Sequence, residues 1–267
     1  MSTSDRTPVD APGRLRIILI RVGLVAGLLL LWQALPGNIV PVDLVGRPSQ
    51  VLVDIWDLFA TGTIFPDLWA TTYEMLLGSV IALPAGVVVA ALTVALPPLA
   101  WLLRPILAVL YAIPKVVLLS VFVLVLGIGS QSKIGLVVSF VAFVYYLYTV
   151  RGLRDVDEDR AVALRRFGAG PLFIARALTL PTAVPHLLAA FRTAIPLAYS
   201  VAIFAELNIT SERGLGSLIG RAAGNLDPSR TIAVIAIVAA IGFGIDIVLV
   251  RLLRRYSASV GLQTVTL

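Results

Sequence analysis

Cysteine is absent from this 267-residue chain, and histidine occurs once, at His186. Without cysteine the chain can form no disulfide, thiolate metal site or cysteine nucleophile, and one histidine excludes a metal site built from several histidines. The sequence also lacks a Ser-His-Asp set and a glutamate pair at the spacing of glycosidases. We therefore predict no metal site, no catalytic residues and no enzyme activity.

Charged residues are also scarce, at 13% of the chain, whereas 59% is hydrophobic and the mean hydropathy is +0.98. A soluble domain is nearer to half apolar and about a quarter charged. The composition therefore indicates an integral membrane protein. The net charge of +6 is explained better by the positions of the positive residues in the loops than by nucleic-acid binding. We therefore expect no nucleic-acid partner.

The apolar stretches predict an all-α protein with six transmembrane helices, at about 17–35, 69–96, 105–126, 134–150, 187–207 and 231–250. They form one transmembrane domain over 14–256, between a disordered tail at 1–13 and a short tail at 257–267. A signal peptide is the alternative for the first stretch, which is long and lacks a small-residue cleavage site. The outer loop from Pro36 to Pro66 should hold an amphipathic interfacial helix with Trp56 at headgroup depth.

The positive residues are distributed unevenly over the predicted loops. With both termini inside, about 15 of the 21 Lys and Arg residues fall on the inner side and about five on the outer side. This skew predicts that both termini are cytoplasmic. It also places the long polar loop 155–185, between the fourth and fifth segments, on the cytoplasmic side.

Loop 155–185 carries signals for a short helix. Asp155 and Asp157 are suited to cap its start, and Arg165 and Arg166 complement the dipole at its end. Gly168 can adopt the left-handed conformation that terminates a helix. An apolar side for packing is expected from Ala161, Val162, Leu164 and Phe167.

A second helix is expected beyond Gly168, from about Pro171 to Leu180, because proline is well tolerated in a first turn. Pro181 and Pro185 should break or kink the chain that follows. The loop is thus predicted to be a platform of two short helices that is presented to a soluble partner.

The spacing from Gly168 to Leu180 and Pro181 resembles the cytoplasmic loop of bacterial ABC-importer permeases. That family's pattern is Glu-Ala-Ala, three residues, Gly, nine residues and Ile-x-Leu-Pro. Ala163 also matches, whereas Val162 stands where the family has Glu. The phrase IPKVVLLSVFVLVLGIGSQSKI and the pattern of Ala205-Glu206, Gly-Leu-Gly at 214–216 and Asp246 resemble the nitrate, sulfonate and taurine branch, so the resemblance covers about 45–255.

The resemblance implies an ABC type I importer permease of the bacterial inner membrane, which takes up a small, anionic solute such as a sulfonate, taurine or nitrate. It further implies a second copy of the chain, two ATPase subunits that bind ATP and Mg, and an extracytoplasmic solute-binding protein. The chain itself should bind no cofactor, because GLGSLIG at 214–220 lacks the preceding strand and lysine of a nucleotide loop. The residues implied in ATPase coupling are Ala161, Val162, Ala163, Leu164, Arg165, Phe167, Gly168, Ala169, Gly170, Leu180 and Pro181.

Charged and polar residues inside spans are candidates for a translocation path. They are Lys115, Tyr199, Ser200 and Glu206. For Lys115, the alternative role is snorkelling or pairing with Glu206 or Asp246. For Glu206, the alternative role is anchoring a loop. An ion-coupled secondary carrier remains the alternative function, although no internal repeat is recognisable. A purely structural membrane protein would explain the spans but not the platform.

Overall fold

The computed structural model describes residues 14–39, 41–209 and 213–259, and the regular elements there are all helices. The predicted all-α fold is confirmed, whereas the expected tail at 1–13 and all but the first three residues of the expected tail at 257–267 lie outside the described residues. The elements are α1 (Arg14–Ala34), α2 (Val42–Val45), α3 (Pro48–Ala60), α4 (Ile64–Ala95), α5 (Pro97–Ala112), α6 (Lys115–Leu126), α7 (Ser130–Arg154), α8 (Glu158–Arg166), α9 (Pro171–Ile174), η1 (Ala175–Thr179), α10 (Leu180–Asn208), α11 (Leu215–Gly224) and α12 (Pro228–Ser259).

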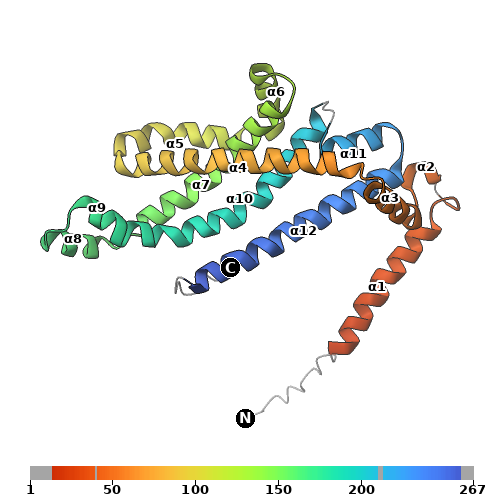
Figure 1. Ribbon diagram of the computed structural model, residues 1–267, viewed down its shortest axis with the longest axis horizontal. Helices are drawn as coiled ribbons and strands as arrows, with labels where there is room; N and C mark the ends of the chain where they lie inside the picture. The colour runs from red at the N-terminus through yellow and green to blue at the C-terminus, as the bar shows by residue number, and fades with distance from the viewer. Residues whose placement is uncertain (1–13, 40, 210–212, 260–267) are drawn as a thin grey trace, which may run out of the picture.

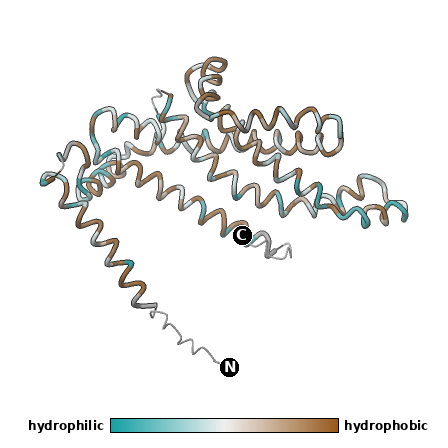
Figure 2. The backbone as a smooth tube through the Cα atoms, turned by 180° about the vertical axis from the view of Figure 1, so that it is seen from behind, coloured by the Kyte–Doolittle hydropathy of each residue, from teal (hydrophilic) through white to brown (hydrophobic). Residues whose placement is uncertain are grey.

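Five helical stretches in the described chain are long and apolar enough to cross a membrane. They are Ile17–Ala34, Ile64–Ala95, Ser130–Arg154, Pro171–Asn208 and Pro228–Arg255. Figure 2 shows the apolar colouring along these helices and more polar residues toward the α8–α9 end. The long helices correspond to five of the six predicted spans.

The third predicted span, 105–126, is divided between α5 and α6. Ile113 is extended, with φ −67° and ψ 128°, and Pro114 precedes the first residue of α6. A residue before proline disfavours the helical conformation, and proline cannot donate the next helical hydrogen bond. The break therefore follows from Pro114, and α5 folds back beside α4 (Figure 1).

Close packing of α4 on α7 forms the centre of the bundle. A Cβ atom added to Gly78 would lie 2.5 Å from the side chain of Val137, and one added to Gly86 would collide with the Ala142 carbonyl. Ala82, between these glycines, is fully buried. Small residues let two membrane helices approach closely and gain dispersion contacts. The α4–α7 pair, joined by α10, is thus a tight core on which the remaining helices are placed.

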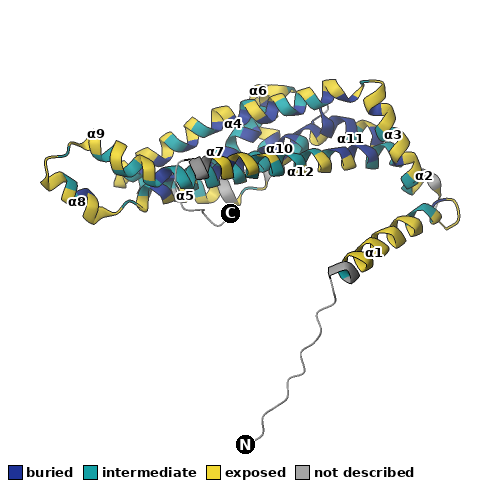
Figure 3. Ribbon diagram, turned by 60° about the horizontal axis from the view of Figure 1, so that its bottom comes forward, coloured by how far each residue is buried: buried dark blue, intermediate teal, exposed yellow. Residues whose placement is uncertain are grey.

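The amphipathic helix expected in the outer loop is confirmed as α3. It buries Val51 and Leu58 within the protein and leaves Trp56 76% exposed. Helix α1 stands apart from the bundle (Figure 3) and is held to α3 by two hydrogen bonds between Gln33 and Ser49, of 3.1 and 3.2 Å. The headgroup depth of Trp56 stays a prediction.

Candidate functional site

Helices α8 and α9 form a platform that projects beyond the other helices at one end of the molecule (Figure 1). Helices α3 and α11 lie at the opposite end, and the long helices α7 and α10 lead into and out of the platform. The platform residues are mainly exposed (Figure 3). Its position makes it available to another molecule without disturbing the bundle.

The start of α8 is fixed by a side-chain cap. Asp157 Oδ1 accepts a hydrogen bond of 3.1 Å from the Arg160 backbone N–H, as predicted from the sequence. The side chains of these two residues also form an ion pair of 2.9 Å, but both are largely exposed, so that pair contributes little. Asp155 does not cap α8. It is the C-cap of α7 and contacts His186 instead.

The Asp157 cap gives a testable prediction. Asp157→Ala should destabilise α8 by about 0.5–2 kcal/mol, because an orphan N–H group at the helix start loses its acceptor. Hydrogen exchange of the α8 amides should therefore become faster, while exchange in α7 stays unchanged. Asp157→Asn, which keeps the acceptor, is the matched control and should exchange like the native protein. Equal protection in the alanine variant would show that the cap does not hold α8.

Gly168 ends α8 in the left-handed conformation that the sequence predicts, with φ +83°. The Ala169 N–H donates to the Leu164 carbonyl at 3.0 Å, and the Gly168 N–H donates to the Arg165 carbonyl at 3.0 Å. These two bonds are the Schellman pattern, which satisfies carbonyls left over at a helix end. The tight corner therefore sets the angle between α8 and α9.

The expected packing of Phe167 is wrong, because its side chain is 90% exposed. Only Ala161, 4% exposed, is buried among the four residues predicted to form the packing side. Phe167 is the C-cap of α8, at the tip of the corner, where the chain supplies no neighbouring surface. Leu172 and Phe173 on α9 are also exposed, at 66% and 57%. The platform thus presents a group of large apolar side chains at its tip.

The remaining residues of the predicted coupling set are distributed over this surface. Ala163, Arg165, Gly168, Gly170, Leu180 and Pro181 are exposed, and Val162, Leu164 and Ala169 are half-buried.

The second predicted helix begins at Pro171 but does not end at Leu180. Helical structure continues from Pro171 to Asn208, passing through Pro181 and Pro185. The segment Ala175–Thr179 is a π-helical turn in which the Leu180 N–H bonds to the Ala175 carbonyl. Proline has no backbone N–H, so it cannot donate a hydrogen bond to a carbonyl of the preceding turn. A π turn is wider than an α-helical turn and shifts this pattern of hydrogen bonds by one residue. The expected break is therefore wrong, whereas the alternative of a kink stays a prediction, and the platform continues directly into α10.

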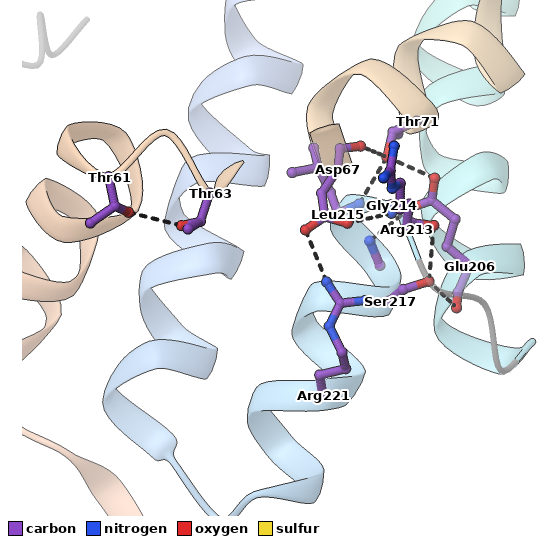
Figure 4. A network of polar contacts seen from close by, with 11 residues as sticks. Thr61, Thr63, Asp67, Thr71, Glu206, Arg213, Gly214, Leu215, Ser217 and Arg221 are labelled. Atoms are coloured by element: carbon purple, nitrogen blue, oxygen red, sulfur yellow. Dashed lines mark hydrogen bonds and ion pairs between the residues drawn. The ribbon is translucent and has the colours of Figure 1, made fainter. Parts of the chain in front are cut away.

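A second candidate site is a buried polar cluster at the opposite end, where Glu206 was expected to face a path. Glu206 is 1% exposed, and its Oε2 accepts the Gly216 N–H at 2.7 Å (Figure 4). Its Oε1 accepts the Thr71 hydroxyl at 2.7 Å, and the Thr71 oxygen accepts the Leu215 N–H at 2.9 Å. Glu206 is thus bound to the start of α11.

Asp67 completes this attachment from α4. Its Oδ1 accepts the Gly214 N–H at 2.7 Å, and its Oδ2 pairs with Arg221 Nη2 at 2.9 Å (Figure 4). Carboxylates are stabilised at a helix N-terminus by its dipole and its free N–H groups. Three successive N–H groups at the start of α11 therefore bind side chains of α4 and α10. Sequence reasoning named loop anchoring as an alternative for Glu206 but missed Asp67 and Thr71.

A buried ion pair lies close to this cluster. Lys133 Nζ on α7 and Glu74 Oε1 on α4 are 2.5 Å apart, and their side chains are 2% and 0% exposed. Removing one partner of such a pair leaves a buried charge without compensation, which is strongly destabilising. At the end of the bundle away from the platform, α4, α7 and α10 are thus joined by charged groups as well as by apolar packing.

Of the other predicted path residues, Tyr199 and Ser200 lie on α10 together with Glu206. Tyr199 is buried and its hydroxyl donates to the Val238 carbonyl at 3.1 Å. Ser200 is exposed and donates to the Pro196 carbonyl at 3.0 Å. Lys115 is the first residue of α6, and its side chain lies outside the described part of the structure. Among the described side chains, no group of three or more His, Cys, Asp or Glu is suited to hold a metal ion.

The sequence is similar to that of known permeases over most of its length. It is 26% identical to the taurine transport system permease protein TauC of Escherichia coli over 246 residues, covering 90% of this chain and 89% of that protein. It is 30% identical to the riboflavin transport system permease protein RibX of Chloroflexus aurantiacus, covering 87% and 88%. A putative aliphatic sulfonates transport permease protein SsuC of Bacillus subtilis is 28% identical, covering 88% and 87%.

Solved structures share the fold. The inward-facing MetNI methionine ABC transporter aligns with a TM-score of 0.58 and 21% identity, over 72% of this chain and 93% of that chain. An amino acid ABC transporter aligns with a TM-score of 0.61 and 17% identity, over 78% and 96%. These likenesses confirm the predicted permease fold.

A family match covers the whole platform and most of the bundle. The family described as "Binding-protein-dependent transport system inner membrane component" matches residues 82–258. Members of this family are membrane components of transport systems that depend on a separate binding protein, and the relatives are permease subunits of such systems. This removes the alternative function of an ion-coupled secondary carrier. The chain therefore belongs to the family of binding-protein-dependent transport system inner membrane components, the permease subunits of ABC importers.

Proposed function

We propose that the platform of α8 and α9 is the docking site for the ATPase subunit of this importer. The observation that carries the proposal is the exposed apolar tip, in which Phe167 is 90% and Leu172 66% exposed. Buried aromatic anchors dominate the affinity of most protein interfaces. A partner with a complementary groove would bury these side chains, as the pattern around Gly168 implies.

The connection of the platform to the bundle supports a role in force transmission. The platform lies between α7 and α10, and both of these long helices contact α4. A push on α8 or α9 is therefore applied to the ends of two helices that reach the opposite side of the bundle (Figure 1). ATP-driven closure of the ATPase subunits would then bias the bundle between two packed arrangements, inward- and outward-open.

Orientation follows from the distribution of arginine. The platform and its flanks carry Arg151, Arg154, Arg160, Arg165, Arg166 and Arg176, and the positive-inside rule places such a cluster in the cytoplasm. We therefore propose cytoplasmic termini, a cytoplasmic platform, and an external position for α3 and α11.

Reporter fusions test this orientation. A reporter inserted at Gly170 should give the cytoplasmic signal, and one inserted at Asn225, beyond α11, should give the external signal. Each insertion lies in an exposed turn, so neither should disturb the bundle. An external signal at Gly170 would contradict both the orientation and the docking of a cytoplasmic ATPase.

The proposed assembly contains two copies of this chain, two ATPase subunits that bind ATP and Mg, and an extracytoplasmic solute-binding protein at the α3–α11 end. We propose a small organic anion of the sulfonate class as the solute, because the taurine and sulfonate permeases are similar over nearly the whole chain. The riboflavin permease relative provides the competing solute class.

Reconstitution tests the proposed function. The permease, solubilised in detergent with its ATPase subunit, should retain that subunit through purification. Proteoliposomes with the solute-binding protein should take up a labelled sulfonate only when ATP is present. Riboflavin uptake in place of sulfonate uptake would reassign the solute class. Uptake without the ATPase subunit would contradict the function itself.

A further inference from the structure

One side-chain contact closes the base of the platform. Asp155 is the C-cap of α7, where the chain enters the platform, and His186 lies on α10, just after the chain leaves it. His186 Nε2 and Asp155 Oδ2 are 2.9 Å apart, a hydrogen-bonding distance. The two ends of the loop 155–185 are therefore linked directly to each other.

Backbone packing supports the same junction. A Cβ atom added to Gly152 would lie 3.0 Å from the His186 Cβ and 3.1 Å from the Ala183 Cα. Gly152 and Ala183 are both buried. Helices α7 and α10 thus contact each other closely immediately next to the Asp155–His186 pair, so their relative position at the base of the platform is tightly defined.

The chemistry of the pair suits a contact that must persist. The imidazole can donate from Nε2–H when it is neutral in that tautomer, and it also donates when it is protonated. The carboxylate accepts in either case, and protonation of the ring adds an ion pair. Because the side chains of His186 and Asp155 are 28% and 62% exposed, water weakens this attraction, and the pair positions helices more than it stabilises the fold.

We propose that Asp155 and His186 are positioning residues that clamp α7 to α10, so that movement of the platform is passed to both helices together. Without the clamp, a push on α8 would partly separate the two helices instead of moving the bundle. The inference rests on the proposed docking of an ATPase subunit on the platform. It assigns the pair to the transmission of movement and not to the docking surface.

The test uses the whole transporter in proteoliposomes, with uptake and ATP hydrolysis measured on the same sample. Asp155→Ala and His186→Ala should each lower the solute taken up per ATP hydrolysed by about two- to fivefold, the range expected for a partly exposed pair. The double alanine variant should be no worse than either single variant, because both changes remove one interaction. Asp155→Asn keeps an acceptor for the Nε2–H group and should restore most of the ratio.

Two controls separate this inference from the proposed function. Arg251→Ala removes an exposed charged side chain of α12, outside the platform and away from the α3–α11 end, and should leave the ratio unchanged. ATPase subunits should co-purify with all clamp variants. If a clamp variant no longer binds the ATPase subunit, the pair acts in docking, and the proposed division between docking surface and clamp is wrong. The clamp would be overturned if both alanine variants took up as much solute per ATP hydrolysed as the native chain. It would also be overturned if, with binding intact, the double variant lowered this ratio by the product of the two single effects.

Discussion

Replacing Phe167 with alanine is expected to lower the affinity of the permease for its ATPase subunit by about thirtyfold or more. An aromatic anchor at the centre of an interface is typically worth about 2 kcal/mol or more, and each 1.4 kcal/mol corresponds to about tenfold in the dissociation constant. Phe167 is 90% exposed, so its removal takes almost no packing from the permease itself. Its loss should therefore act on binding and not on folding.

The affinity is measured by titrating labelled ATPase subunit onto the permease in detergent, and uptake is followed in proteoliposomes. Phe65→Ala is the matched control, because Phe65 is a 53% exposed phenylalanine at the opposite end of the molecule. The control should bind the ATPase subunit as the native chain does. Native affinity in Phe167→Ala, at an unchanged level of permease in the membrane, would remove Phe167 from the docking surface.

Glu206→Ala should destabilise the permease strongly. The substitution leaves the Gly216 N–H buried without the acceptor that it now has at 2.7 Å, whereas the Thr71 hydroxyl loses its 2.7 Å bond to Glu206 but keeps the Asp67 carbonyl at 3.2 Å. An unsatisfied buried group costs about 1–3 kcal/mol, so the orphaned Gly216 N–H should cost about that much, and the lost Thr71 bond should add about 0.5–1.5 kcal/mol. The start of α11 should detach from α4 and α10, and the unfolding temperature in detergent should fall by several degrees.

The expected order of stability distinguishes the hydrogen bonds from general disturbance. Glu206→Gln keeps one carbonyl acceptor and should fall between the alanine variant and the native chain. Ser200→Ala, at an exposed position of the same helix, should change the free energy of unfolding by no more than about 0.5 kcal/mol. If Glu206→Ala unfolds at the native temperature, the carboxylate is not what holds α11.

The local signals of the platform could be read from the sequence because each depends on neighbours in the chain. Asp157 caps the helix that follows it, and Gly168 ends that helix in the left-handed conformation. The exposure of Phe167 could not be read in this way. An apolar residue beside a helix favours packing, but the sequence does not say whether the neighbouring surface belongs to the same chain or to a partner.

Prolines were harder to interpret than glycines. Pro114 breaks the third apolar stretch, although the hydropathy of that stretch alone predicts one span. Pro181 and Pro185 lie within continuous helix, with Pro181 in the first turn of α10 directly after the π turn at Ala175–Thr179. The same residue type therefore had opposite outcomes: Ile113 before Pro114 is extended, whereas Leu180 before Pro181 is helical.

The buried polar cluster had no local signal at all. Asp67 and Gly214 are 147 positions apart, and Thr71 and Leu215 are 144 positions apart. Glu206 and the Gly-Leu-Gly motif were each recognised, but their contact depends on how α10 and α11 turn at the end opposite the platform. The Lys133–Glu74 pair likewise joins two helices whose packing is decided by small residues elsewhere, at Gly78 and Gly86. Contacts of this kind follow from the fold and not from sequence spacing.

The central claim, that the platform is the surface on which the ATPase subunit acts, can be tested by site-directed cross-linking. The chain contains no cysteine, so Ala163→Cys introduces its only thiol on the exposed part of α8. Asn225→Cys places the only thiol at the opposite end instead. We expect a thiol-reactive cross-linker to join Ala163→Cys, and not Asn225→Cys, to the ATPase subunit, with a yield that changes when ATP is bound. Cross-linking from Asn225→Cys alone, or a yield from Ala163→Cys that ATP leaves unchanged, would contradict the account.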